Sequence, residues 1–243
     1  MIRVLELFSG TGSVGKCCKE LGWEVVSVDM ILPADHQCDI MDFDYKQYPK
    51  DYFHCVAASP PCTNYSKLKA CWYGRKLKDG TIYSKEQNMK DQDEADKLVL
   101  KTMEIIQYFD PELWWIENPQ TGNLKNREIM KDIPFYDVDY CMYSDWGYKK
   151  KTRIWTNKED FEPLICDHSG ACGNMITIDT KGEIHNGFKT GRKHKIHKCN
   201  LGNADNKLRK IHCKDVSKSV GGGTNRLDRY RVPADLIYSL FLD

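Results

Sequence analysis

Apolar and amphipathic stretches alternate along the first two thirds of the chain. Four apolar runs predict buried strands, at residues 2–8, 23–30, 52–59 and 113–119. Amphipathic or glycine-closed stretches predict helices at 14–22, 84–109 and, near the end of the chain, 232–241. Strands that alternate with helices in this way predict an α/β domain built on a mostly parallel sheet.

Polar residues follow the predicted strands at the points where the strands end. They are Ser9–Gly12, Asp29, Cys62 and Glu117–Asn118. Ligands of open parallel sheets bind at the carboxyl ends of the strands, so we expect these residues to gather along one edge. Two prolines precede Cys62 and stiffen its turn, because proline fixes φ and forces extended geometry on the residue before it.

The pattern changes after residue 157. Residues 158–215 show no strong periodicity and are rich in Gly, Lys, His and Asn, which predicts a loop-rich insert or small second domain. Residues 1–157 then form the main domain, and 216–243 return to it. Lys and Arg outnumber Asp and Glu between residues 181 and 215, which fits either a solvated loop or a phosphate-facing patch.

Composition narrows the class of protein. The chain has 243 residues, 29% of them charged, and its net charge of +1 does not indicate an attraction of the whole molecule to nucleic acid. No apolar run is long enough to predict a membrane span, and the first residues lack the pattern of a signal peptide. The eleven cysteines are therefore expected to be reduced thiols in a cytoplasmic protein.

A glycine loop follows the first predicted strand. Gly10, Gly12 and Gly15 satisfy the spacing G-x-G-x-x-G, and the backbone of such a loop approaches a ligand closely. Asp29 ends the next strand, where an acidic side chain can hold the hydroxyls of a ribose. The same segment imitates a phosphate-binding P-loop over residues 10–16, although Cys17 replaces the Ser or Thr that binds magnesium.

Cysteine and histidine concentrate in the least hydrophobic segment. Cys166 and Cys172 are separated by five residues, and the run KHKIHKC brings His194, His197 and Cys199. A zinc ion needs about four such ligands, and the candidate set is Cys166, Cys172, His194 and Cys199. Free cysteines in a basic loop are the alternative.

Four segments together resemble the DNA (cytosine-5) methyltransferase family. They are LELFSGTGS (5–13), SPPC (59–62), WIENP (115–119) and KKKTRIW (149–155), and they occur in the family's order. The resemblance covers residues 1–157. It implies a Rossmann-like methyltransferase fold that uses S-adenosylmethionine, with residues 158–215 as a small, loop-rich target-recognition insert.

The resemblance also implies roles for individual residues. Cys62 would attack C6 of a cytosine flipped out of the duplex, Glu117 would bind or protonate N3, and Arg153 would contact O2. Asn118 would orient the loop. The residues expected to contact the cofactor are Phe8, Gly10, Thr11, Gly12, Asp29, Met30, Asp39, Ile40 and Pro60.

This chemistry needs a reactive thiolate, and helix termini or cations close to Cys62 would help by lowering the pKa of its thiol. The chain departs from the family at two points. The family's Gln-x-Arg-x-Arg motif becomes Lys149-x-Lys151-x-Arg153, and Pro119 stands where the family commonly has Val.

The sequence thus predicts methylation of cytosine C5 in double-stranded DNA, by a monomer encoded by a microbe, phage or virus. Two other functions stay open. One is the same chemistry on an RNA such as tRNA, and the other is a catalytically inactive DNA-binding module.

Overall fold

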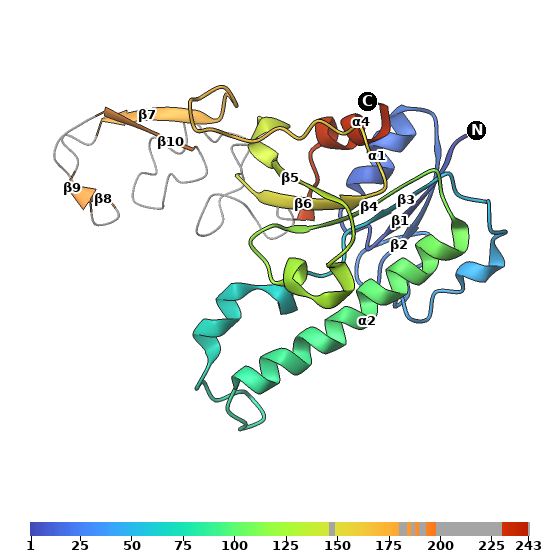
Figure 1. The fold of residues 1–243 in the computed structure, drawn as a ribbon, viewed down its shortest axis with the longest axis horizontal. Helices are drawn as coiled ribbons and strands as arrows, with labels where there is room; N and C mark the ends of the chain where they lie inside the picture. Colours follow the sequence, from blue (N-terminus) through green and yellow to red (C-terminus); the bar gives the residue numbers. More distant parts are fainter. Residues whose placement is uncertain (146–148, 180–183, 186–187, 190–192, 198–229, 243) are drawn as a thin grey trace.

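A six-stranded sheet forms the centre of the computed structural model, which describes residues 1–145, 149–179, 184–185, 188–189, 193–197 and 230–242 (Figure 1). The strand order is β2-β1-β3-β4-β6-β5. The strands are β1 (Arg3–Leu7), β2 (Glu24–Val28), β3 (Cys55–Ala58), β4 (Leu113–Pro119), β5 (Phe135–Asp139) and β6 (Lys151–Thr156). β1 to β4 run parallel, and β6 runs antiparallel to both β4 and β5. This mixed sheet confirms the predicted Rossmann-like α/β fold.

Three α-helices of the described residues cover the two faces of the sheet (Figure 1). They are α1 (Ser13–Glu20), α2 (Lys85–Phe109) and α4 (Ala234–Leu242). α1 and α4 contact each other on one face, and α2 crosses the other. Short 3-10 turns connect the elements: η1 (Tyr45–Gln47), η2 (Thr63–Tyr65), η3 (Lys67–Trp72), η4 (Leu124–Asn126), η5 (Glu128–Met130) and η6 (Tyr140–Met142).

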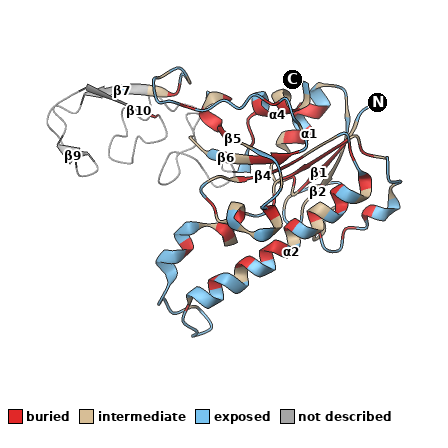
Figure 2. Ribbon diagram, viewed as in Figure 1, coloured by how far each residue is buried: buried red, intermediate tan, exposed pale blue. Residues whose placement is uncertain are grey.

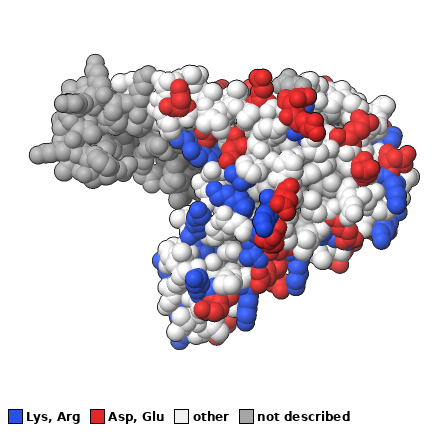
Figure 3. All heavy atoms as spheres, viewed as in Figure 1, with Lys and Arg blue, Asp and Glu red and all other residues white. Residues whose placement is uncertain are grey.

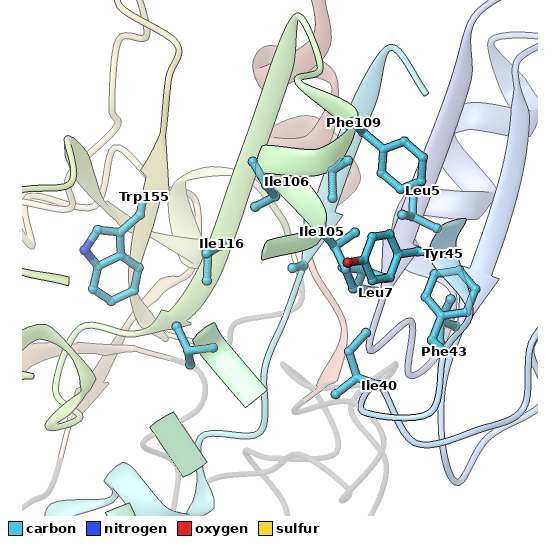
Figure 4. Close-up of a cluster of buried hydrophobic side chains, with 14 of the residues drawn as sticks. Leu5, Leu7, Ile40, Phe43, Tyr45, Ile105, Ile106, Phe109, Ile116 and Trp155 are labelled. Atoms are coloured by element: carbon cyan, nitrogen blue, oxygen red, sulfur yellow. The ribbon is translucent and has the colours of Figure 1, made fainter. Parts of the chain in front are cut away.

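Alternate residues of the strands pack into two separate hydrophobic cores. Leu5, Leu7 and Ile116 face α2 and pack in the cluster drawn in Figure 4. Val4 and Trp115 point the other way and pack with the residues of α1 and α4. The central strands β1, β3 and β4 are therefore buried on both faces (Figure 2), which is why they appear in the sequence as continuous apolar runs.

α2 supports one of these cores with its second half, from Ala95 to Phe109. Its first turn is capped by Ser84, whose Oγ accepts a hydrogen bond from the backbone N–H of Gln87 at 3.1 Å. The helix ends before Asp110, which adopts a left-handed conformation with φ of 46°. Val99 and Ile105 are fully buried, and burial of such a side chain stabilises the fold by about 1.5–3 kcal/mol.

The insert contains strands that the sequence did not predict. β7 (Met175–Asp179) pairs antiparallel with β10 (Lys193–His197), and β8 (Ile184–His185) pairs with β9 (Phe188–Lys189). The sequence analysis predicted a loop-rich insert or small second domain and named no strands within it. β5 was also not predicted. The boundaries at residues 157 and 215 stay a prediction. In the described part of the chain, every helix is too short or too polar to cross a bilayer.

Candidate active site

Cys62 lies on the loop that follows β3, and Asn118 fastens that loop to β4. The Nδ2 of Asn118 donates a hydrogen bond to the backbone oxygen of Pro60 at 2.9 Å, and both residues are buried. The backbone oxygen of Cys62 in turn accepts a bond from Tyr65 N at 3.1 Å, which begins η2. The structure thus brings Cys62, Asn118 and Pro60 together at the end of the sheet, with Asn118 placed to orient the loop.

Glu117 is the buried carboxylate next to this loop. Its side chain is 7% exposed. Two donors bind the same oxygen: the hydroxyl of Tyr140 lies 2.9 Å from Oε1, and the Nζ of Lys150 lies 2.8 Å from it. Lys150 also lies over the ring of Tyr140, 4.9 Å from its centroid. The carboxylate is therefore held in one orientation by a phenol and an ammonium group.

The charges of Glu117 and Lys150 both act on the thiol of Cys62. Burial raises the pKa of the Cys62 thiol, Lys150 acts to lower this pKa, and Glu117 acts to raise it. The net result is a raised pKa, although one nearby cation, Lys150, acts in the direction that the chemistry needs. The physical reason is that desolvation of the thiolate outweighs the attraction of the lysine.

Arg153 lies apart from this group. Its guanidinium donates to both carboxylate oxygens of Asp137, at 2.7 and 2.8 Å, and stacks on Phe135 with its Cζ 3.5 Å from the ring centroid. Arg153 pairs with Asn118 in the sheet register, and Glu117 pairs with Ile154, so the arginine is on the face opposite to Glu117. Its contact with a base oxygen stays a prediction.

Lys150 is the functional candidate that the sequence analysis missed. The motif spacing selected Lys149, Lys151 and Arg153, but the residue between the two lysines reaches Glu117. Lys149 instead lies 2.6 Å from the Nε2 of His168, and Lys151 is exposed. The run of three lysines was the available signal, and only the backbone geometry decides which of them points inward.

The glycine loop connects β1 with α1. Gly10 and Gly12 have φ of 55° and 67°, a left-handed region that favours glycine. The backbone N–H of Gly10 donates to Asp29 Oδ2 at 2.8 Å, while Asp29 Oδ1 accepts from the N–H groups of Ile31 and Leu32. Asp29 thereby fixes the glycine loop against the loop that follows β2.

A second carboxylate, that of Glu6, binds backbone N–H groups at the N-terminus of α1. Glu6 accepts hydrogen bonds from Val14 N at 3.1 Å and Gly15 N at 3.0 Å, and is 4% exposed. Burial raises its pKa to about 7, although the two hydrogen bonds oppose the shift. The donors that a P-loop would offer to a phosphate are therefore already used, which contradicts the P-loop alternative and the expected anion site.

The other predicted cofactor residues surround the glycine loop and the loop after β2. Phe8 is half-buried and has a positive φ of 55°, whereas Met30 is 60% exposed. Thr11 lies in the glycine loop, with its Oγ1 3.3 Å from Ser13 Oγ. Asp39 Oδ1 accepts a bond from Met41 N at 2.9 Å, and Ile40 packs in the apolar core of Figure 4 with 4% exposure. Their contacts with a cofactor stay a prediction.

A cysteine and histidine cluster lies beyond β5. It joins two of the residues predicted from sequence, Cys166 and Cys172, with Cys141 and His197, and the ligand atoms all lie within 4.8 Å of one another. His194 belongs to β10, but its side chain is not among those that the structure describes. Cys199 lies outside the described residues.

Basic side chains are frequent on the segment that follows Cys62. Residues 67–78 hold five Lys or Arg and no Asp or Glu. In the same segment, Trp72 is 44% exposed and Tyr73 is 40% exposed. Blue side chains gather between the lower end of α2 and the β7–β10 hairpin in Figure 3. A cavity of about 530 Å³ lies elsewhere, between η6 and the start of α4, and is lined by none of the predicted catalytic or cofactor residues.

Comparisons with known proteins found one strong sequence relative, while no family model matches the chain. The chain is 36% identical over 241 residues to a protein of Frog virus 3 (isolate Goorha) named "Probable DNA (cytosine-5)-methyltransferase", and the match covers 98% of both chains.

Two solved structures are also similar. Entamoeba histolytica methyltransferase EhMeth matches at a TM-score of 0.45 and 16% identity, covering 68% of this chain and 56% of its own. The S. pombe Dnmt2 methyltransferase matches at 0.39 and 12%, covering 68% and 51%. The chain spans about half the length of these two proteins.

Proposed function

The chain belongs to the DNA (cytosine-5)-methyltransferase family, and from that premise we propose that it transfers a methyl group from S-adenosylmethionine to C5 of cytosine in DNA. The observation that carries the proposal is the group formed by Cys62, Glu117 and Lys150. A nucleophile on a stiff loop, a fixed carboxylate and a cation meet there at the carboxyl end of the parallel strands.

Cys62 supplies the nucleophile in the proposed mechanism. Its thiolate adds to C6 of the flipped base, and the π electrons of the C5–C6 bond shift toward C4 and N3, which makes C5 a nucleophile. C5 would then take the methyl group of the bound sulfonium, whose sulfur would leave as a neutral thioether. Loss of the C5 proton to a base, followed by breakage of the bond between sulfur and C6, restores the aromatic ring and the free thiolate. Flipping the base costs about a few kcal/mol, which contacts with the protein must offset.

Glu117 and Lys150 stabilise the charge that this addition creates. The two donors to Glu117 both bind Oε1, which leaves Oε2 as the oxygen that faces N3 of the base. The ammonium of Lys150 attracts the electron density that builds on the ring, and it favours the thiolate of Cys62. We therefore assign Lys150 the electrostatic role that the resemblance gave to Arg153, whose guanidinium is engaged with Asp137.

The glycine loop fits S-adenosylmethionine better than it fits a nucleotide phosphate. A side-chain carbon added at Gly12 would meet no atom within 4 Å, so the loop is open to a ligand on this side. Glu6 occupies the nearest backbone donors, and S-adenosylmethionine carries no phosphate to compete for them. Asp29 would hold the ribose hydroxyls, with Phe8 and the exposed Met30 beside the adenine. When bound, the cofactor supplies an activated methyl group on its sulfonium.

Duplex DNA is the substrate that we propose. The name of the viral relative specifies DNA, and the basic segment at 67–78 is suited to phosphates. Trp72 and Tyr73 on the same segment expose rings that can stack on bases. The source of the relative also favours a virus-encoded enzyme that acts inside the infected cell. We propose that the protein acts as a monomer.

The test measures transfer of a tritium-labelled methyl group to duplex DNA and to tRNA in parallel, for wild-type protein and for Cys62→Ala. We expect label in DNA with wild-type protein alone. A covalent complex with DNA that contains 5-fluorocytosine should form with wild-type protein and be absent with Cys62→Ala. Label in tRNA but not in DNA would overturn the substrate, and an adduct formed by Cys62→Ala would overturn the nucleophile.

A further inference from the structure

Four potential metal ligands meet where the insert joins the sheet. Cys141 follows β5 in η6, Cys166 and Cys172 flank the loop that leads to β7, and His197 is the last residue of β10. Cys141, Cys166 and His197 are 0%, 6% and 2% exposed. Three elements that are distant in sequence therefore converge on one small, buried volume.

The distances suit a tetrahedral zinc ion. Zinc bonds to sulfur at about 2.3 Å and to nitrogen at about 2.0–2.1 Å, so neighbouring ligands of a tetrahedron lie about 3.6 Å apart for sulfur and nitrogen. The Nε2 of His197 lies 3.5 Å from Cys166 Sγ and 3.8 Å from Cys172 Sγ. We propose that Cys141, Cys166, Cys172 and His197 bind a structural zinc ion, in a closed site of three cysteines and one histidine.

Polar contacts around the cluster hold its loops in place. Asn174 is fully buried, and its Nδ2 donates to the backbone oxygens of Cys141 at 2.8 Å and Cys172 at 3.0 Å. The N–H of Cys166 donates to Asp139 Oδ2 at 3.0 Å. Such outer contacts fix the ligands before a metal arrives, which is what a preformed metal site requires.

A positive charge lies near the proposed zinc site and balances the charge of its ligands. Binding of Zn²⁺ releases three thiol protons to solvent and leaves three thiolates, one neutral imidazole and a net charge of −1. Lys149 lies 2.6 Å from His168, and the ring of His168 packs edge-on against His197 with 5.1 Å between centroids. A positive charge thus lies close to the site and offsets its excess negative charge.

The proposed zinc site ties the β7–β10 hairpin to the body of the protein. The hairpin extends away from the sheet beyond β5 (Figure 1), and His197 and Cys172 lie at its base. Cys141 adjoins Tyr140, the hydroxyl donor to Glu117. The ion would therefore fix the insert relative to the candidate active site. The inference does not depend on methyl transfer, because the site is defined by its ligands alone.

Zinc analysis and X-ray absorption on wild-type protein provide the first test. We expect about one zinc ion per chain, bound by three sulfur atoms and one nitrogen. Zinc well below one equivalent, or a ligand set with two sulfurs and two nitrogens, would overturn the proposal. This measurement needs no variant and is independent of whether a substitution disturbs folding.

Matched substitutions identify the ligands. His197→Ala and Cys141→Ser should lose zinc, whereas His194→Ala and the exposed Cys71→Ser should retain it. Cobalt added to metal-free wild-type protein should give the absorption bands of a tetrahedral thiolate site. Loss of zinc in His194→Ala together with retention in His197→Ala would refute this ligand set.

Discussion

Replacing Lys150 with methionine should slow methyl transfer and move its pH dependence to higher pH. The Nζ of Lys150 lies 2.8 Å from Glu117 Oε1, and the two side chains are only 13% and 7% exposed. A preorganised donor that stabilises developing charge in such a site contributes about 10²–10³-fold to the rate. We therefore expect kcat to fall by about that factor.

The direction of the pH shift follows from the groups around Cys62. Burial already raises the pKa of the thiol, and Lys150 acts against this. Without the lysine the pKa rises further, so a smaller fraction of Cys62 is thiolate at any pH below it. The acidic limb of the pH profile of kcat/KM should therefore move upward.

The substitution also affects stability, so the assay needs controls. Removing one partner of a buried ion pair costs about 3–5 kcal/mol of unfolding free energy, and thermal melting would show whether the variant is folded at the assay temperature. Lys151→Met removes the same charge from an exposed position of β6, and should leave the acidic limb in place. Lys150→Arg should restore part of the rate. If Lys150→Met and Lys151→Met had equal rates and the same acidic limb, the assignment of Lys150 would be refuted.

Three other changes test separate features. Arg153→Ala breaks a largely buried ion pair with Asp137 and should cost about 3 kcal/mol of unfolding free energy while kcat changes only several-fold; a loss of about 100-fold in kcat with unchanged stability would instead support a role at the base oxygen. Glu6 has a pKa raised from 4.5 to about 7, so its own contribution to stability should be fully present below pH 4.5 and should fall by about 3 kcal/mol as pH rises to about 7. Urea unfolding at several pH values should show this fall, and Glu6→Gln should remove it; an unchanged slope would contradict the assignment. Arg75→Ala combined with Lys76→Ala should reduce the slope of log Kd against log salt for duplex DNA by about 2, and an unchanged slope would exclude these two residues as phosphate contacts.

The central strands and α2 could be predicted because burial on both faces leaves a strong apolar signal. The run at 113–119 coincides with β4, and residues 84–109 differ from α2 only by the capping Ser84. β5 (FYDVD) and β7 (MITID) gave no such signal, because five residues with two or more polar positions form too short a run to be told from a loop. What makes them strands is pairing with β6 and β10, which is not visible in the local sequence.

The candidate site was predictable where it depends on strand ends and unpredictable where it depends on register. Cys62, Glu117 and Asn118 could be predicted because each lies at, or just after, the carboxyl end of a parallel strand. Arg153 does not, because β6 is antiparallel and a shift of one residue moves every side chain to the other face. The observed register sets Arg153 opposite Asn118 and away from the face of Glu117, and Lys150 is the cation that contacts Glu117.

The buried carboxyl group of Glu6 restricts which ligands the glycine loop can bind. The spacing of Gly10, Gly12 and Gly15 suits phosphates as well as S-adenosylmethionine, and the loop alone does not separate these ligands. A carboxylate in the middle of an apolar strand requires donors, and Glu6 takes those of Val14 and Gly15 at the start of α1. A phosphate at that position would meet a carboxylate and lose both donors. We therefore expect the ligand of this loop to be one that brings no phosphate, and a sulfonium carried by a nucleoside satisfies that condition.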